Sequence, residues 1–514
     1  MANVSNISKV YLLGVPLESD YKHTLYFANA SAQQTYFQSQ IKKSYTDFSY
    51  QRKDKIIRIP AEYDTLTSCN YVMYQNSSYS NKWFYAFITK LEYVNDAVTD
   101  VHIETDVIQT WLFDYTFKTS FVEREHVDND TVGLHTVAEN VETGEYIVNS
   151  HYEDNQNSSL NIVLQATLSP GEMVALLGHN YNGVPSGVSY YKMASVQALK
   201  QTLETYSSGH ADAITGLFLA PSYLCPDLGG VITDTTAPAT FDINIDKMTS
   251  LNGYTPTNKK LLTMPYCYIM VSNAQGSNAI YRQEVWSVNG NNKMVFRNYG
   301  ALTPGCSIKG VPINYNGTEI NMDEGINLGK FPTLNWATDQ YTNWLTQNAV
   351  NIAVNTAGSL LSIAGGVAAA STGVGAGLGA GAIAGGVSGI ASTVGQVYQH
   401  SFTPPQAQGN LNSGDVTTGM QKNVFHVYKM SIKQEYARII DGYFNMFGYK
   451  VNTVKVPNTA HRSRYWYTKT IDANIDGDIA QEDMQKIKDC YNRGITFWRN
   501  ASEIQNYSLS NSIV

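Results

Sequence analysis

The residues best placed to do chemistry form one acidic stretch near the C-terminus, DANIDGDIAQED. Oxygen-bearing side chains recur at alternate positions, with a glycine at the sixth position and an isoleucine at the eighth. This spacing is typical of a calcium-binding loop. The candidate ligands are Asp472, Asn474, Asp476, Asp478 and Asp483. The last of them stands where such loops carry a bidentate glutamate, so the match is incomplete.

The neighbouring elements favour a different interpretation of this stretch. Calcium loops of that type lie between two helices, whereas the preceding Arg464–Ile471 (RYWYTKTI) predicts a strand. A helix is predicted to begin near Gln481, and acidic residues stabilise a helix N-terminus. We therefore predict a polar turn that leads into a helix, without a bound metal, and keep calcium as the weaker alternative.

A second polar cluster lies in the sequence FVEREHVDND. Its carboxylates and its imidazole are groups that could hold a metal or transfer protons. These residues are Glu123, Glu125, His126, Asp128 and Asp130. No partner cluster appears elsewhere in the sequence, so we predict a solvated strand end here.

Other signatures of catalysis or cofactor binding are weak or missing. The pattern Gly375-x-Gly377-x-x-Ala380 loosely matches a dinucleotide-binding loop, but no strand is predicted before it and no acidic residue follows at the required distance. The sequence contains neither HExxH nor GxSxG. The five cysteines are widely spaced and predict buried free thiols. We expect no cofactor and no enzymatic activity.

The composition favours strands. Charged residues make up only 15% of the 514 residues, and tyrosine, asparagine, serine and threonine take their place. Apolar and polar residues alternate in 82–94 and 98–113, and strands are also predicted in 260–300 and 424–432. Helices are predicted at 195–206, 211–219 and 434–447. The fold class is therefore mainly β with some α, in two to four domains.

The net charge of −8 disfavours tight binding to a nucleic-acid backbone, which needs a basic face. It is compatible with a surface along which DNA moves without sticking. The N-terminal residues lack a basic segment followed by a long apolar run. We therefore expect no secretory signal, and synthesis in the cytoplasm.

One long block has an unusual composition for a chain of this kind. Between Gln340 and Gly414 there is no Asp, Glu, Lys or Arg, and Val350–Val394 consists mainly of glycine, alanine and other apolar residues. Its larger side chains are Leu360, Leu361, Ile363, Val367, Val374, Leu378, Ile383, Val387 and Ile390. A buried core segment, a flexible linker and a membrane-active segment are the three possibilities.

Conditional insertion into a membrane explains most features of this block. The ranges 350–370 and 374–394 are each long enough to cross a bilayer once as a helix. Glycines four residues apart allow close packing of helices in lipid, at Gly373, Gly377, Gly381, Gly385 and Gly389. A core segment so rich in glycine would bury little side-chain area, and a permanently exposed one would aggregate. We therefore favour a segment that is stored folded and inserted later.

The order of several stretches resembles a known family. They are VPLESDYKHTLYFANASAQQTYF (15–37), SNKWFYAFITKLEYVNDAVTDVHIETDVIQTW (80–111), SFVEREHVDND (120–130), LNGYTPTNKKLLTMPYCYIMVSN (251–273), YGALTPGCSIKGVPINYNG (299–317), YARIIDGYFNMFGYKVN (436–452) and GITFWRN (494–500). In this order the chain resembles the tail knob, or distal tail tube, proteins of short-tailed phages of the phi29 type. The match is weakest over 131–230.

The resemblance implies a virion structural protein at the tail tip, assembled as a homohexamer with β-barrel-like tube domains. Apolar loops would plug the lumen and, on release, transiently penetrate the host membrane to let DNA pass without sequence recognition. Val350–Val394 occupies the corresponding place. Implied partners are the upper and lower collar proteins and the tip protein of the tail.

The expected organisation has four parts. They are an N-terminal tube domain (1–130), a mixed middle or knob region (131–335), the hydrophobic loop (336–414) and a C-terminal segment that packs back on the tube and knob (415–514). An alternative function is a host-surface adhesin that does not insert into membranes. A calcium-dependent wall hydrolase that uses 472–483 is a further alternative.

Overall fold

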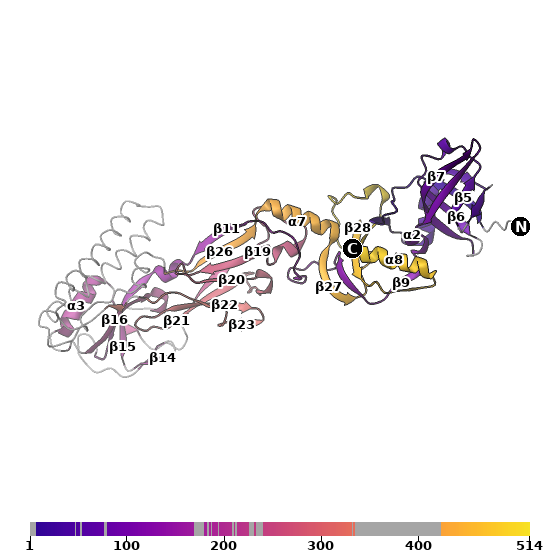
Figure 1. The fold of residues 1–514 in the computed structure, drawn as a ribbon. Coiled ribbons are helices and arrows are strands. Elements are labelled where there is room, and N and C mark those ends of the chain that lie inside the picture. Colours follow the sequence, from indigo (N-terminus) through magenta and orange to yellow (C-terminus); the bar gives the residue numbers. More distant parts are fainter. Residues whose placement is uncertain are drawn as a thin grey trace. The chain divides into compact units, whose positions relative to one another are not determined.

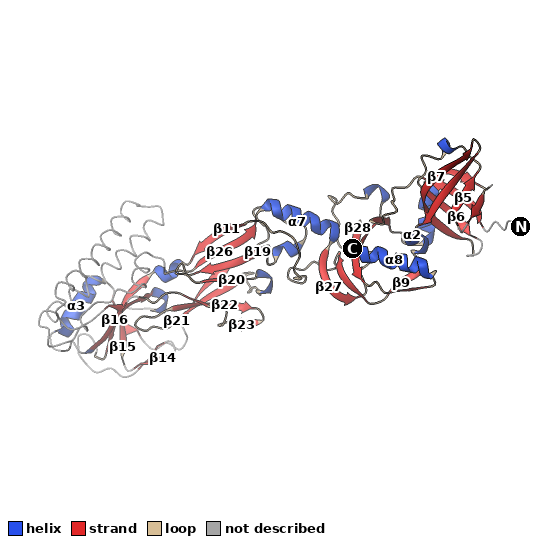
Figure 2. Ribbon diagram, viewed as in Figure 1, coloured by secondary structure: helices blue, strands red, loops and turns tan. Residues whose placement is uncertain are grey.

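The computed structural model of the chain describes residues 7–46, 48–51, 54–76, 80–168, 179–181, 184–186, 188–193, 195–207, 210, 213–225, 231–232, 240–331, 333–334 and 423–514. Strands predominate and helices are few (Figure 2). The predicted mainly β class with some α is therefore confirmed. Val350–Val394 and the rest of the charge-free block to Gly414 lie outside the described residues.

The chain divides into two compact units, each built from separate stretches of sequence. The first unit comprises Met1–Thr143, Pro256–Leu261 and Glu435–Val514. The second comprises Gly144–Thr255 and Leu262–Gln434. The C-terminal residues thus share a unit with the N-terminal ones, and a six-residue stretch from mid-sequence joins them.

The first unit begins with a seven-stranded antiparallel sheet in the order β3-β1-β6-β7-β8-β5-β4. Figure 1 labels β5, β6 and β7 of this sheet. Its strands are β1 (Ile7–Leu13), β3 (Ile41–Tyr45), β4 (Ser49–Gln51), β5 (Ile56–Ile59), β6 (Tyr71–Asn76), β7 (Lys82–Asn95) and β8 (Val98–Thr105). Alternate residues of β6 enter two different cores, with Val72 in one and Tyr71 in the other. Both faces of the sheet are therefore covered, which explains why its central strands are so apolar.

The hairpin predicted from 82–94 and 98–113 is present as β7 and β8. The second strand was predicted too long, because β8 ends at Thr105. After β8 the chain forms the short helix α2 (Val107–Trp111), where a continued strand was predicted. The Asp106 side chain caps this helix by accepting a hydrogen bond from the Gln109 N–H at 3.0 Å. Every residue of α2 is buried, including the polar Gln109 and Thr110, so no exposed polar face identifies this helix.

A five-stranded sheet, order β2-β30-β28-β10-β27, completes the first unit with a two-stranded pair and three more helices. The strands are β2 (His23–Leu25), β10 (Ser120–Glu125), β27 (Tyr449–Lys455), β28 (Tyr465–Ile471) and β30 (Ile495–Trp498), with β9 (Tyr115–Phe117) paired to β29 (Ile475–Gly477). The helices are α1 (Ala30–Ser39), α7 (Gln434–Phe447) and α8 (Gln481–Arg493). The predicted helix at 434–447 and the helix start near Gln481 are confirmed.

The described residues of the second unit form three larger sheets and one hairpin. Their orders are β11-β26-β19-β20, β17-β15-β12-β16-β25, β18-β21-β22-β23 with β24 on β22, and β13-β14. The strands are β11 (Tyr146–Glu153), β12 (Leu160–Ala166), β13 (His179–Tyr181), β14 (Val184–Ser186), β15 (Ser189–Met193), β16 (Ile214–Pro221), β17 (Val231–Ile232), β18 (Thr240–Ile245), β19 (Cys267–Ser272), β20 (Asn278–Tyr281), β21 (Met294–Gly300), β22 (Ile308–Tyr315), β23 (Thr318–Ile320), β24 (Ile326–Asn327), β25 (Thr333–Leu334) and β26 (His426–Ile432). The helix predicted at 195–206 is α3 (Val196–Ser207).

The helix predicted at 211–219 is wrong, because Ile214–Pro221 forms strand β16. This strand lies between β12 and β25 and is buried along most of its length. A short apolar run covered on both faces has no polar side that would separate strand from helix. Short 3₁₀ turns complete the described fold at Tyr63–Thr65, Asn155–Ser158, Ser222–Leu224, Lys259–Leu262, Gln283–Val285 and Ala501–Glu503.

Candidate functional site

The polar cluster in FVEREHVDND is partly buried, which corrects the prediction of a solvated strand end. Its strand β10 lies between β27 and β28 instead of at an edge. Glu125 is fully buried and His126 is 4% exposed, whereas Asp128 is exposed. Glu125 pairs with Lys455 and accepts a hydrogen bond from the Asn458 N–H at 3.0 Å. The buried Glu125 carboxylate is therefore matched by specific partners.

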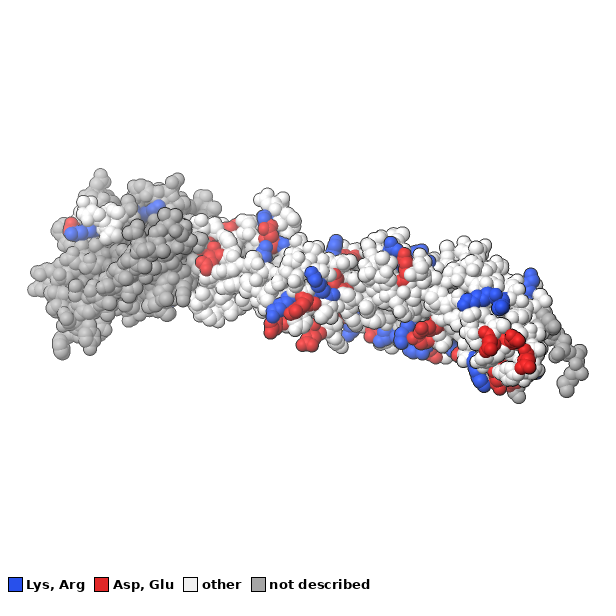
Figure 3. Space-filling view, turned by 90° about the horizontal axis from the view of Figure 1, so that it is seen from above, with Lys and Arg blue, Asp and Glu red and all other residues white. Residues whose placement is uncertain are grey.

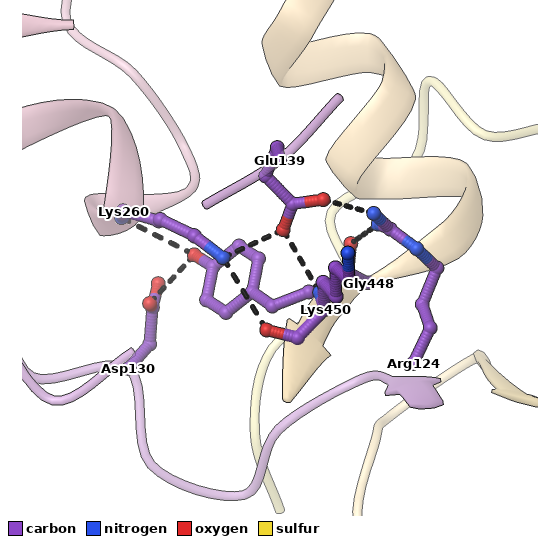
Figure 4. A network of polar contacts seen from close by, with 7 residues as sticks. Arg124, Asp130, Glu139, Lys260, Gly448 and Lys450 are labelled. Atoms are coloured by element: carbon purple, nitrogen blue, oxygen red, sulfur yellow. Dashed lines mark hydrogen bonds and ion pairs between the residues drawn. The ribbon is translucent and has the colours of Figure 1, made fainter. Parts of the chain in front are cut away.

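A buried carboxylate, Glu139, lies at the centre of the polar network drawn in Figure 4. Its side chain is fully buried, and it pairs with the guanidinium of Arg124 and with Lys260 Nζ at 2.6 Å. It also accepts a hydrogen bond from the Lys450 N–H at 2.8 Å. Arg124 and Lys260 have side chains only 9% and 3% exposed, so two buried cations depend on one carboxylate.

Neighbouring contacts attach the mid-sequence stretch to the same place. The Tyr449 hydroxyl donates to Asp130 at 2.6 Å, and the Lys259 N–H donates to the other oxygen of that carboxylate at 3.0 Å. Asp441 on α7 accepts hydrogen bonds from the N–H groups of Thr257 and Asn258 at 2.8 and 3.0 Å. Residues 256–261 are thereby held against β10, α7 and β27 of their own unit.

The turn between α7 and β27 requires a glycine. Gly448 has φ +63, and a Cβ at this position would lie 2.1 Å from the Glu125 carbonyl oxygen. Its own carbonyl accepts from Arg124 at 2.6 Å. The turn thus brings Lys450 to Glu139 and the Gly448 carbonyl to Arg124. Each charged side chain in this arrangement has an ion-pair or hydrogen-bond partner, so the arrangement is suited to holding chain segments together.

His126 is held as a neutral imidazole. Its Nδ1 accepts a hydrogen bond from the Tyr467 N–H at 2.8 Å, and its Nε2 lies 3.1 Å from the Asn445 carbonyl oxygen, to which it can only donate. Burial, and to a lesser degree the nearby charge of Arg462, lowers the pKa of His126 to about 3.

This imidazole should make the first unit sensitive to acid. The folded pKa lies below the unfolded value of about 6.5, so the stabilisation is complete above that pH and is lost as the pH falls. By pH 5 the loss should be about 2 kcal/mol. Asp106 acts in the opposite direction, because burial raises its pKa to about 6. Urea unfolding of the native chain and of His126→Gln, at neutral pH and near pH 5, isolates the contribution of His126 to the pH dependence of the free energy of unfolding. A pH dependence that is identical in both proteins would contradict the assignment.

The calcium-like stretch forms the predicted turn before α8, here with strand β29 inside it. Its carboxylates do not converge, since no three of them offer oxygens within 4.8 Å of one another. Asp476 pairs with Lys118 at 3.3 Å, and Asp483 accepts a hydrogen bond from the Trp111 indole at 3.0 Å. These contacts give two of the candidate ligands structural partners, and calcium binding here stays the weaker alternative.

The candidate residues of the predicted membrane segment lie outside the described ranges. Within those ranges, no helix combines the length and the apolarity that crossing a bilayer demands. On the face drawn in Figure 3, acidic and basic side chains of the described residues are interspersed, without a continuous basic band. The five cysteines are all buried and free, as predicted.

Sequence reasoning missed the residues on which the first unit depends most. Glu139, Lys260 and Asp441 lie far apart in sequence and belong to no motif. The only available signal was that the chain carries few charged residues, so that those in apolar surroundings should be paired.

Two family models match the sequence. The model described as Bacillus phage phi29, tail knob protein gp9, C-terminal domain, matches residues 233–512. The model described as caudoviral major tail protein N-terminus matches residues 6–116. Together the two matches cover most of both the first unit and the second.

Curated relatives match over nearly their whole length. The tail knob protein gp9 of Bacillus phage phi29 is 28% identical, and the alignment covers 98% of each chain. The tail knob protein gp9 of Bacillus phage B103 is also 28% identical, with 97% of each chain covered.

A solved structure has the same fold. The bacteriophage C1 tail knob protein gp12 superposes with a TM-score of 0.66 over 99% of this chain and 100% of its own, at 16% sequence identity. The family model, the curated relatives and the fold of the solved structure thus confirm the resemblance found in the sequence. The chain belongs to the family of the phi29 tail knob protein gp9, and it is a structural component of a phage tail, not an enzyme.

Proposed function

We propose that six copies of this chain form the distal tube and knob of the tail, and that Val350–Val394 of each copy closes the lumen and later enters the host membrane. The observation that carries the proposal is a block without a single charged residue from Gln340 to Gly414, in the middle of a polar tail protein. Such a block is costly in water and favourable in lipid. The released segments would line a passage for the phage DNA.

The composition of the block suits a segment with two states. Its many glycines and alanines allow close packing in a plug, and the glycines spaced by four residues allow helices to approach closely in lipid. Backbone N–H and C=O groups in lipid must be hydrogen-bonded within the protein. The inserted segment should therefore be helical, or its irregular backbone should be surrounded by other protein segments. No Lys or Arg lies within the block to fix an orientation, which suits conditional rather than permanent insertion.

The charge of the chain suits a conduit for DNA. Six chains of net charge −8 carry −48 together. An acidic lumen repels phosphate, so DNA would slide through without binding and without sequence recognition. A strongly basic lumen in the assembled tube would contradict this part of the proposal.

One exposed apolar row in the first unit is suited to subunit contact. The strand register places Phe121 of β10 between Val454 of β27 and Ile471 of β28. Val454 and Ile471 are 65% and 54% exposed, and β27 is the last strand of the described sheet. An exposed apolar row beside a terminal strand is a surface that a second copy can cover.

The assembly can be tested by mass measurement of the purified chain. We expect hexamers, and we expect Val454→Asp combined with Ile471→Asp to weaken them roughly a hundredfold, at about 1.5 kcal/mol for each of the two lost apolar contacts. Ile439→Asp, another exposed apolar residue at 70% exposure, is the matched control and should leave assembly unchanged. Trimers would instead favour the adhesin alternative, and equal effects of both variants would contradict the assigned face.

The proposed organisation keeps residues 1–130 in the tube, 131–335 in the middle or knob region, 336–414 as the loop and 415–514 packed back on the others. Tail position requires contacts with neighbouring tail proteins, for which collar and tip proteins are the candidates. Host membrane contact would be transient, at ejection, after synthesis in the host cytoplasm and assembly into the virion.

A further inference from the structure

We infer that His151, Glu153 and His426, in the second unit, form a binding site for a zinc-class divalent metal ion. None of these residues belongs to the acidic stretches that the sequence singled out. The two histidines are 275 residues apart in the chain. The site is independent of the proposed membrane function.

Strand pairing places the three side chains on one face of the sheet. In the antiparallel pair β11–β26, His151 lies opposite Tyr428 and Glu153 lies opposite His426. Residues two apart on a strand point to the same side, so both pairs share one face. Figure 1 shows β11 and β26 side by side, with β19 next in the sheet.

The distances between the ligand atoms suit a single ion. His151 Nε2 and His426 Nδ1 are 3.1 Å apart, and Glu153 Oε1 lies 3.7 and 3.5 Å from these two nitrogens. Ligands at about 2.1 Å from a tetrahedral zinc ion are separated by about 3.4 Å. One ion can therefore contact all three atoms with little movement of the side chains.

The surroundings support nitrogen-rich coordination with an open position. The Tyr428 ring stacks on the His151 ring at 4.5 Å and 8°, which fixes the orientation of this imidazole. The side chains of His426, His151 and Glu153 are 13%, 37% and 49% exposed, so water can reach the ion from one side. Two imidazoles and one carboxylate prefer zinc and its neighbours over calcium or magnesium.

A bound ion would join two strands that come from distant parts of the sequence. β11 is the last strand of its sheet on one side, and His426 is the first residue of β26. The ion would therefore link a terminal strand to its neighbour. His426 lies three residues after residue 423, where the last described range of the chain begins.

Titration of the full-length, EDTA-treated protein with zinc chloride in a calorimeter tests this site. We expect one ion per chain, and a loss of affinity of roughly a hundredfold or more in both His151→Ala and His426→Ala. The matched control is His102→Ala, because His102 pairs with a single carboxylate, Glu92 at 2.9 Å, without a second imidazole. This variant should bind like the native chain.

Thermal melting separates loss of the site from loss of the fold. Zinc should raise the melting temperature of the native chain and of His102→Ala but not of the other two variants. In the absence of zinc the variants should melt close to the native chain. Failure of the native chain to bind zinc, or native-like affinity in both His151→Ala and His426→Ala, would overturn the inference.

Discussion

Replacing Glu139 by alanine is expected to destabilise the first unit by about 3–5 kcal/mol. The change would leave two buried cations, Arg124 and Lys260, without their shared carboxylate, and it would remove the acceptor of the Lys450 N–H. Burial already lowers the pKa of Lys260, and its pairing with Glu139 opposes that effect. Hydrogen exchange of the amides in β10 and β27 would report the loss where the contacts are made.

A neighbouring ion pair provides the control for this change. Glu123 lies on the same strand as Arg124 and pairs with Lys469 at 2.8 Å, with both side chains partly exposed. Glu123→Ala should therefore cost less than about 1 kcal/mol. If Glu139→Ala and Glu123→Ala were equally stable, the buried Glu139 network would not be a main source of the first unit's stability.

Gly381→Arg is expected to leave tube assembly intact and to reduce membrane permeabilisation strongly. Gly381 lies within the second predicted crossing, 374–394. An arginine at mid-bilayer costs about 3 kcal/mol on insertion, which is roughly a hundredfold in the insertion equilibrium of one segment. Dye release from liposomes at matched protein concentration measures the effect.

The control for this variant adds the same charge outside the apolar segment. Ser413→Arg lies beyond Val350–Val394, in the polar part of the charge-free block. It should release dye like the native chain. Equal losses in the two variants would mean that added charge impairs the protein in some way other than blocked insertion.

Local patterns in the sequence predict much of the fold. Alternation identified β7 and β8, although the prediction continued past the end of β8, and a helical pattern identified α7 at its observed bounds. Two of the errors fall where burial hides the pattern: every residue of α2 is buried and β16 is buried along most of its length, so the period of their sequences does not separate helix from strand.

The important polar sites could not be predicted in the same way. Glu139 meets Lys260 and Lys450 only because three distant stretches converge in one unit, and His151 meets His426 only through pairing of β11 with β26. A pattern such as His-x-Glu in a strand places two ligands on one face, but it cannot reveal the third. By contrast, the apolar block is recognisable from composition alone.

The central claim, that Val350–Val394 opens membranes, is tested most directly by dye leakage from liposomes. The native chain would be compared with a chain whose Val350–Val394 is replaced by a short polar linker, at neutral and at mildly acidic pH, with hexamer mass checked for both. We predict leakage with the native chain only. Absence of leakage from intact native hexamers, or equal leakage from both proteins, would contradict the claim and leave the block a passive plug.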